Sequence, residues 1–394
     1  MRAFVVACSL ALATPIGVVR AGPVFAGRRN VVHRGVDPSA PAATSGVDGS
    51  RGGRSPYRAP ERAPERAGTI ALGSTLASPM ATRDGTLYVP TDAGLVVIGS
   101  DGRERFRLPG EPVLETPTLL ASGDVAFATS LSTLVIVSPE GAVRRRATLS
   151  SPVVHSIVAL PDGALCYATR DLVFRCDELD GSPRFANRLF ALPSTDPALA
   201  GDGSLLLAVG DELLALDALG TERWRAPLGA SVAVGPVVAP GGKAFVLTYA
   251  GELVTVALAD GRTRRRLLPV RPGGSGGLFV GPDGSLVVAV PGAALIAFDA
   301  AGEERFRTDR RGSFGAAGLV DADGVFLGLN QEGVLHALGP DGRERWRIEL
   351  GERTDAPPIL LPDGTLVVPF RSGSLASWRP PCASTSSTSN CPRN

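Results

Sequence analysis

The sequence predicts an all-β chain that forms an eight-bladed β-propeller of four-stranded antiparallel blades, and three observations support this. A turn of the Asp-Gly type recurs eight times, at steps of 39, 39, 40, 39, 42, 40 and 40 residues. A second series of similar turns interleaves with the first, at steps of 39 to 41 residues. The runs between the turns are short and rich in Val, Leu, Phe and Ala, which suits strands. Four short strands in every ~40–45 residues are typical of a propeller blade.

Each period therefore contains four strands, A to D, joined by two kinds of tight turn. Gly tolerates positive φ and Asp hydrogen-bonds the local backbone, so this pair favours hairpins. The turns between strands A and B are Asp84-Gly85, Gly123-Asp124, Asp162-Gly163, Asp202-Gly203, Gly241-Gly242, Asp283-Gly284, Asp323-Gly324 and Asp363-Gly364. The turns between strands C and D are Asp101-Gly102, Glu140-Gly141, Asp180-Gly181, Leu219-Gly220, Asp260-Gly261, Ala301-Gly302 and Asp341-Gly342.

The first blade shows how the strands are assigned, and the last blade shows how the ring closes. In the first blade we expect strands at 78–83, 86–90, 95–99 and 103–108. After Trp378 the chain meets two prolines and a polar tail, so the last blade has no fourth strand of its own. Residues 69–73 resemble a D strand at 347–351. We therefore expect the N-terminal strand to close the last blade, which leaves no open edge at the joint.

The segments outside the repeats have compositions of their own. Residues 1–26 combine a basic start with an apolar run and small residues, as in a secretory signal peptide. Retention as an anchor and lipidation at Cys8 are the alternatives. Residues 27–68 are rich in Arg, Pro, Gly and Ser and are expected to be a disordered linker. Residues 69–379 form the propeller and 380–394 a Ser/Thr-rich tail. We expect an exported protein, periplasmic or at the cell surface, with no transmembrane span after cleavage.

Four cysteines remain after removal of the signal segment, an even number in an exported chain. Cys166 and Cys176 fall on neighbouring strands of one hairpin and could face each other, as a disulfide or as two buried thiols. Cys382 and Cys391 bracket a short polar loop in the tail, where a disulfide is favoured.

Charge and motifs exclude several classes of function. The chain has 40 Lys and Arg against 39 Asp and Glu, for a net charge of +1. This balance argues against a nucleic-acid-binding protein, which usually has a basic excess. The three histidines are scattered without metal-ligand spacing. Residues 273–277 match the G-x-S-x-G pattern but lack the strand-to-helix context of a nucleophile elbow. We expect no catalytic residue, no metal and no cofactor, and no small-molecule substrate.

The fourth strands carry a recurring aromatic residue flanked by arginines. The aromatics are Phe106, Phe185, Trp224, Phe306 and Trp346. We expect each to pack between blades, with the arginines pointing outward. The arginines are Arg105, Arg107, Arg223, Arg225, Arg305, Arg307, Arg345 and Arg347. They either protect the outer strand edges or form a basic rim that attracts anionic glycans or lipid headgroups.

Recognition residues are expected where the loops vary most. The B–C and D–A connections share one face of a propeller, and variable loops on a rigid scaffold are the usual place for binding. The B–C candidates are Asp92, Arg170, Asp171, Glu252, Gln331, Glu332 and Arg371. The D–A candidates are Arg310, Arg311, Arg353 and Asp355, together with Glu111, Glu115, His155, Asp196 and Arg271.

The repeat resembles the pyrroloquinoline-quinone-like (PQQ-like) propeller repeat. In that family the repeat has an apolar strand, an Asp, a Gly turn and a Trp on the outer strand. The resembling segments are 214–224, 296–306 and 336–346. The family includes quinone-dependent dehydrogenases and non-enzymatic envelope propellers, such as the lipoprotein propeller of the barrel-assembly machine. The dehydrogenases often carry a disulfide between adjacent cysteines, and this chain has no Cys-Cys pair. Their catalytic Asp and calcium ligands cannot be assigned to any residue here.

The resemblance implies a non-catalytic, exported scaffold that binds a protein or another envelope component through its B–C and D–A loops. Two alternatives belong to other classes of function. One is a diverged PQQ-dependent oxidoreductase, and the other is a glycan- or anion-binding surface protein that uses the arginine rim.

Overall fold

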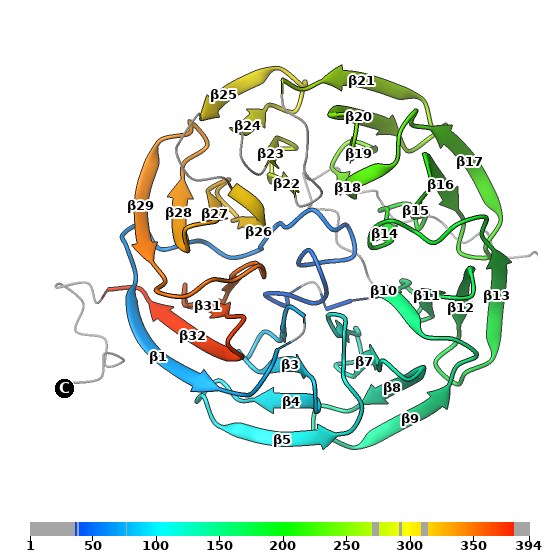
Figure 1. The fold of residues 1–394 in the computed structure, drawn as a ribbon, viewed down its shortest axis with the longest axis horizontal. Coiled ribbons are helices and arrows are strands. Elements are labelled where there is room, and N and C mark those ends of the chain that lie inside the picture. Colours follow the sequence, from blue (N-terminus) through cyan, green and yellow to red (C-terminus); the bar gives the residue numbers. More distant parts are fainter. Residues whose placement is uncertain are drawn as a thin grey trace, which may run out of the picture. The chain divides into compact units, whose positions relative to one another are not determined.

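A computed structural model describes residues 36–37, 39–75, 77–269, 276–290, 294–308 and 314–381. Over these residues the chain forms eight four-stranded antiparallel sheets and no helix. The sheets stand around an axis as the blades of one ring (Figure 1). The predicted all-β, eight-bladed propeller is therefore confirmed.

The first four blades each follow the strand order A to D from the axis outward. Blade 1 has β2 (Met80–Ala81), β3 (Leu87–Thr91), β4 (Gly94–Ile98) and β5 (Glu104–Pro109). Blade 2 has β6 (Thr118–Leu119), β7 (Val125–Ala128), β8 (Thr133–Val137) and β9 (Val143–Thr148). Blade 3 has β10 (Val153–Ala159), β11 (Leu165–Thr169), β12 (Val173–Asp177) and β13 (Pro183–Arg188). Blade 4 has β14 (Ala198–Leu199), β15 (Leu205–Val209), β16 (Glu212–Leu216) and β17 (Glu222–Pro227).

The next three blades repeat this order, and blade 8 departs from it. Blade 5 has β18 (Val232–Ala239), β19 (Lys243–Thr248), β20 (Glu252–Ala257) and β21 (Thr263–Leu267). Blade 6 has β22 (Gly277–Val280), β23 (Leu286–Val290), β24 (Ala294–Phe298) and β25 (Glu304–Thr308). Blade 7 has β26 (Phe314–Val320), β27 (Phe326–Asn330), β28 (Val334–Leu338) and β29 (Glu344–Glu349). Blade 8 has β30 (Ile359–Leu360), β31 (Leu366–Pro369) and β32 (Ser374–Arg379), completed by β1 (Glu65–Ala71).

Closure of the ring by the N-terminal strand is confirmed. Strand β1 pairs with β32 in antiparallel register, with Ile70 opposite Leu375 and Gly68 opposite Ser377. The strand begins at Glu65, four residues before the predicted start, so its first part lies within the segment expected to be a linker. Ile70 packs with buried residues of blade 1, among them Leu87 and Ile98. Strand β1 therefore completes the sheet of blade 8 and also contacts blade 1.

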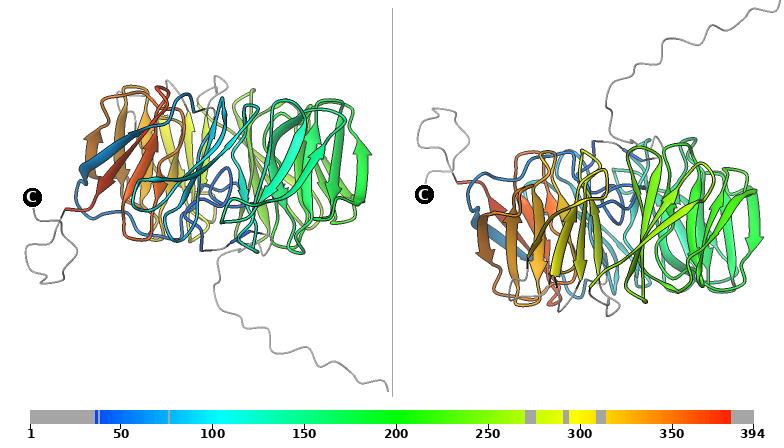
Figure 2. Two further views of the ribbon diagram at one scale, coloured as in Figure 1. Left: turned by 90° about the horizontal axis from the view of Figure 1, so that it is seen from below. Right: turned by 90° about the horizontal axis from the view of Figure 1, so that it is seen from above.

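The expectation of a disordered linker over 27–68 is wrong for the part that the structure describes. Residues 40–55 lie at the axis of the ring, and most of them are buried. Figures 1 and 2 show this segment in blue at the centre of the ring, between its two faces. Six innermost strands donate backbone N–H groups to it, at 2.8–2.9 Å. The donor–acceptor pairs are Ala81–Ala42, Leu119–Ala43, Leu199–Gly49, Val238–Ser50, Val280–Gly52 and Val320–Gly53.

The small residues of this segment, which suggested disorder, allow it to lie at the axis of the ring. A Gly-, Ala- and Ser-rich chain cannot form a core of its own. The innermost strand of each blade, however, has an unpaired edge whose backbone groups need partners. Small side chains let the segment approach those edges closely. Gly53 has φ +60°, and a Cβ there would lie 2.8 Å from Phe279 Cδ1. The ring thus supplies the packing that the segment lacks by itself.

Candidate functional site

The strand order gives the ring two different faces. The A–B and C–D turns lie on one of them, which we call the turn face, and the B–C and D–A connections lie on the other, the loop face. The loop face carries the residues predicted to bind a partner. Because the strands beneath it are fully paired, the loops are held on a rigid base.

Four of the predicted residues come together at a cleft of about 510 Å³ over blades 7 and 8. Gln331 comes from the B–C turn of blade 7 and Arg371 from that of blade 8. Arg353 and Asp355 come from the D–A connection between these blades. Gly315, Ala316 and Ala317 of β26 form an apolar wall. A second hollow of about 190 Å³ lies beside it and shares Thr354, Asp355 and Arg371.

Local hydrogen bonds fix the shape of this cleft. Arg371 forms an ion pair with Asp355, and both side chains remain mostly exposed, at 68% and 69%. The backbone N–H of Arg371 donates to the carbonyl oxygen of Arg353 at 3.3 Å. Buried Asn330 accepts hydrogen bonds from the backbone N–H groups of Glu332 and Val334, at 3.0 and 2.9 Å. The cleft therefore presents an exposed carboxylate, two guanidinium groups and an amide on a fixed backbone.

The remaining predicted residues do not join this cleft. Glu332 lies next to Gln331 in the same turn but is not among the residues that line it. Asp92, Arg170 and Asp171 belong to the B–C turns of blades 1 and 3, and Glu252 is the first residue of β20, directly after the B–C turn of blade 5. Glu252 lies 3.6 Å from Arg265 on the adjacent strand β21. Arg271, Arg310 and Arg311 lie outside the described residues.

A second cluster of polar residues lies where the axis meets the loop face. Its central residue, Arg51, was not predicted. Arg51 is buried and donates through Nε to the carbonyl of Pro197 at 2.9 Å and through Nη1 to that of Ser45 at 2.7 Å. Asp196 accepts hydrogen bonds from the Ser156 backbone N–H at 2.8 Å and from Ser45 Oγ at 2.7 Å. Arg51 is one of several arginines in an Arg-, Gly- and Ser-rich segment, so the sequence does not single it out for such a role.

The electrostatics of this group follow from its burial. Burial raises the pKa of Glu115 to about 7, and the charge of Asp196 adds to the rise, against the backbone N–H of His155 and the charge of Arg51. Burial also acts to raise the pKa of Asp196. The guanidinium of Arg51 and the hydrogen bonds from Ser156 and Ser45 outweigh it, so that the pKa falls below its usual range. His155 sits at φ 67°, a backbone conformation uncommon outside Gly.

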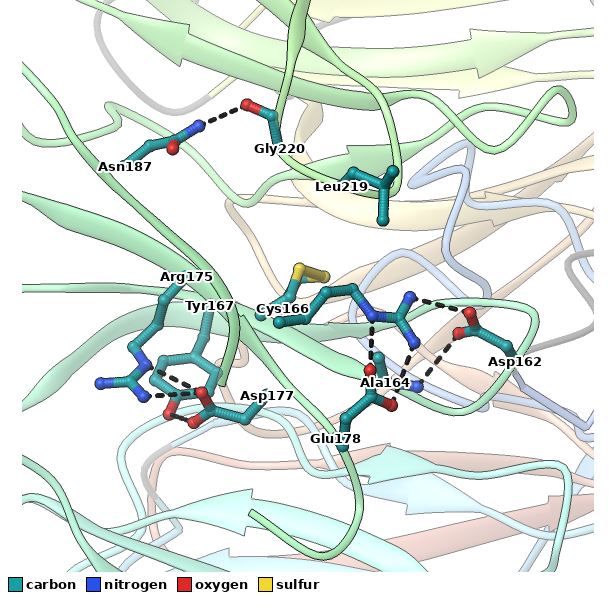
Figure 3. The surroundings of a disulfide bond; sticks show 12 residues. Asp162, Ala164, Cys166, Tyr167, Arg175, Asp177, Glu178, Asn187, Leu219 and Gly220 are labelled. Atoms are coloured by element: carbon teal, nitrogen blue, oxygen red, sulfur yellow. Dashed lines mark hydrogen bonds and ion pairs between the residues drawn. A yellow bond between two sulfur atoms is a disulfide. The ribbon is translucent and has the colours of Figure 1, made fainter. Parts of the chain in front are cut away.

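Cys166 and Cys176 face each other on β11 and β12 and are joined by a disulfide, with Cα atoms 4.0 Å apart (Figure 3). Both are fully buried. Around them Arg175 pairs with Asp177 at 2.6 Å, and Arg184 pairs with Glu178 at 2.7 Å and Asp162 at 2.8 Å. Cys382 and Cys391 lie outside the described residues.

The arginines of the outer strands are bound to neighbouring carboxylates. Arg107, Arg225 and Arg307 pair with the Glu three residues earlier on the same strand, at 2.8, 2.8 and 2.9 Å. Other outer-strand arginines reach back to the Asp of the A–B turn in their own blade. These pairs are Arg105–Asp84, Arg223–Asp202 and Arg305–Asp283. These six arginines are therefore paired with carboxylates of their own blade.

Among the described residues, no group of three His, Cys, Asp or Glu side chains is arranged to hold a metal ion. Over the same ranges, no helix is both long and apolar enough to cross a bilayer.

Comparison with solved structures places the ring among known propellers. BamB from Moraxella catarrhalis aligns with a TM-score of 0.64 and 17% identity, over 80% of this chain and 98% of that one. Quinohemoprotein alcohol dehydrogenase from Comamonas testosteroni aligns with a TM-score of 0.68 and 12% identity, over 90% and 83%. Sqt1 from Saccharomyces cerevisiae aligns with a TM-score of 0.63 and 11% identity, over 81% and 100%. At these identities the likeness is one of fold.

For part of the chain, sequence comparison identifies the family more specifically than structural similarity does. A search of curated proteins found no match. The family described as outer membrane protein assembly factor BamB matches residues 131–267 and 265–381, which together exceed half of the chain. The aromatic D strands and glycine turns in these ranges are the features of the PQQ-like repeat. The chain therefore belongs to this BamB family of PQQ-like repeat β-propellers.

Proposed function

We propose that this protein is an exported, non-catalytic scaffold that binds another protein or a cell-envelope component through the cleft over blades 7 and 8 on its loop face. The observation that carries the proposal is the gathering of Gln331, Arg353, Asp355 and Arg371 from three separate connections at one hollow. Exposed charges on a rigid base set orientation and association rate in protein recognition.

The axis of the ring supports a surface role. A propeller usually has a central channel, and a concave, largely preformed pocket is where a small molecule binds. Here residues 42–53 occupy the axis through backbone hydrogen bonds to six blades. The loop face carries a cleft, a hollow beside it and variable side chains, and it remains open to a partner.

Export is part of the proposal and rests on other features. The family's description names an outer-membrane assembly factor, and residues 1–26 have the pattern of a secretory signal. The Cys166–Cys176 disulfide suits an oxidising compartment such as the periplasm. We propose a periplasmic or cell-surface location on these grounds.

The test is crosslinking of the tagged, exported protein in living cells, followed by mass spectrometry of its partners. The double variant Arg353→Glu/Arg371→Glu reverses the charge of the cleft. Arg170→Glu is the matched control, because Arg170 is an exposed B–C turn residue of the same face outside the cleft. We expect the double variant to lose at least ten-fold of the main crosslinked partner and the control to retain it. Equal recovery from both variants would overturn the proposal.

The oxidoreductase alternative is supported by the structural similarity to a quinohemoprotein alcohol dehydrogenase. This similarity is one of fold alone. It requires dye-linked turnover in the presence of calcium and the quinone. Our proposal predicts no turnover and no quinone binding by titration. Detection of turnover or of quinone binding would reject the proposal.

A further inference from the structure

The junctions between blades share one contact on the turn face. A planar side chain from the outer strand of one blade stacks over the C–D turn glycine of the next. The aromatic pairs are Phe106–Gly141, Phe185–Gly220, Trp224–Gly261 and Phe306–Gly342. A Cβ on these glycines would lie 3.0, 2.5, 2.8 and 2.7 Å from the ring atoms, so glycine is required for the close approach. The prediction that these aromatics pack between blades is thus confirmed for them.

The other junctions use variants of the same contact. The Arg145 guanidinium lies over Gly181 between blades 2 and 3. Arg266 donates to the carbonyl of Gly302 at 2.7 Å between blades 5 and 6. In blade 7, Trp346 Nε1 donates to the carbonyl of Pro60 at 2.7 Å, as Trp224 Nε1 does to that of Leu258 at 2.8 Å. The chain that enters β1 therefore replaces the C–D turn that blade 8 lacks.

The junction between blades 8 and 1 lacks a planar side chain at this position. Blade 7 gives the reference position: Trp346 on the outer strand is paired with Ala337, four residues after the B–C turn glycine Gly333. In blade 8 the residue four positions after the B–C turn glycine Gly373 is Ser377, and its partner on the outer strand is Gly68. Gly68 therefore occupies the position that Trp346 has in blade 7. A Cβ on Gly68 would meet only Ser377 Oγ, at 4.0 Å.

A cavity of about 510 Å³ lies at this junction. The C–D turn glycine of blade 1, Gly102, lines it and has only Ile70 Cδ1 near the position of its Cβ, at 3.6 Å. The rest of the lining combines apolar residues of both blades with charged turn residues, among them Leu87, Ile98, Val367, Leu375, Arg83 and Asp101. This volume falls within the range of about 300–1,000 Å³ that is usual for binding pockets.

We propose that this cavity receives an aromatic side chain of a partner protein, with its ring stacked on Gly102 in the place that Phe or Trp occupies at the other junctions. The occupant is inferred from the molecule itself, because the same site in neighbouring blades takes an aromatic ring over a glycine. Residues 382–394 contain no Phe, Tyr or Trp, so the tail that follows β32 cannot supply the ring. The site is on the turn face and is independent of the cleft over blades 7 and 8.

The test is a titration of the full chain with the tripeptide Gly-Trp-Gly, followed by saturation-transfer NMR, with Gly-Ala-Gly and free indole as comparison probes. We expect Gly-Trp-Gly to bind with a Kd of about 1 mM, indole more weakly, and Gly-Ala-Gly not at all. The variant Gly68→Phe fills the cavity from within, so it should weaken tripeptide binding at least ten-fold. It should also raise Tm or leave it unchanged.

The control is Gly110→Phe, since Gly110 lies in a D–A connection on the opposite face and a Cβ there meets nothing within 4 Å. This variant should bind the tripeptide as the wild type does. If Gly68→Phe fails to fold, Ser377→Phe fills the same space from the facing strand. Absence of tripeptide binding, binding equal to that of indole, or binding that survives the filling variant would each overturn the proposal. Charge reversal at Arg353 and Arg371 leaves this titration unchanged, which separates it from the test of the loop face.

Discussion

At the axis of the ring, contacts are made by backbone groups and small side chains, whereas at the rim they are made by long charged side chains. Residues 42–53 accept hydrogen bonds from six blades at 2.8–2.9 Å and are largely buried. The rim pairs, such as Arg225 with Glu222, join side chains that are 38% and 43% exposed. Buried hydrogen bonds contribute about 1 kcal/mol each and are costly to leave unmade, while exposed ion pairs contribute about 0–1 kcal/mol. The stability of the ring should therefore depend far more on its axis than on its edge.

The strongest test of this difference is to remove the axis segment. A chain that begins at Ala59 keeps the contacts of Ala59 and Pro60 with blade 7 but loses all six backbone hydrogen bonds at the axis. We expect a loss of about 5 kcal/mol and a fall in Tm of about 10 °C. Calorimetry measures this, and a synthetic peptide of residues 36–58 added in trans should restore part of the Tm by binding the native state. A fall in Tm of less than 2 °C would show that the hydrogen bonds of the segment do not stabilise the ring.

A smaller effect should follow from a single methyl group at the axis. Gly53→Ala places a Cβ 2.8 Å from Phe279 Cδ1 at φ +60°. We expect a loss of about 3 kcal/mol from strain and crowding together. Gly351→Ala has a similar φ, +79°, with nothing within 4 Å, and should cost about 1 kcal/mol. Equal losses by urea denaturation would mean that crowding at the axis contributes nothing.

The pH dependence of stability should come from Glu115, at the loop-face end of the axis. Its pKa of about 7 in the folded chain lies above the unfolded value of 4.5, so the folded state holds the proton more tightly. The resulting stabilisation is complete below about pH 4.5 and is lost as the pH rises through 7. Glu115→Gln removes this dependence, and wild type should lose about 2 kcal/mol relative to the variant between pH 4.5 and 8, allowing for partial exposure. Thermal melts at both pH values check it, and a constant difference would contradict it.

The smallest effect is expected at the rim. Arg225→Ala removes ion pairs with Glu222 at 2.8 Å and Glu212 at 2.7 Å. We expect a loss of about 0.5 kcal/mol, which disappears at 1 M salt because exposed charges are screened. A loss of more than 2 kcal/mol in the free energy of unfolding, measured by urea denaturation, would show that the rim stabilises the ring as much as the axis does.

The parts of the fold that could be predicted from sequence are those whose signals are local. A Gly at positive φ after an Asp specifies a turn, and the short apolar runs at 87–89 and 95–98 indicate two strands. The axis segment could not be predicted, because its partners are backbone groups on six strands spread over residues 81–320. The loop face was predicted, but the meeting of Gln331, Arg353, Asp355 and Arg371 depends on blades 7 and 8 being adjacent in the ring. Arg51 was missed because most of its hydrogen bonds go to backbone carbonyls, such as those of Pro197 and Ser45, which have no side-chain signature.

The closure of blade 8 also sets the order in which the molecule can be completed. Strand β1 is made before blades 1 to 7 and its partner β32 after them, with Ile70 opposite Leu375. Blades 1 to 7 are local hairpins and can form as they emerge, but the eighth can form only after β32 has been made. A ribosome that stops short of residue 374 leaves β1 without a partner and the ring open. Such a product exposes an unpaired strand of seven residues, whose backbone groups are open to pairing with another chain.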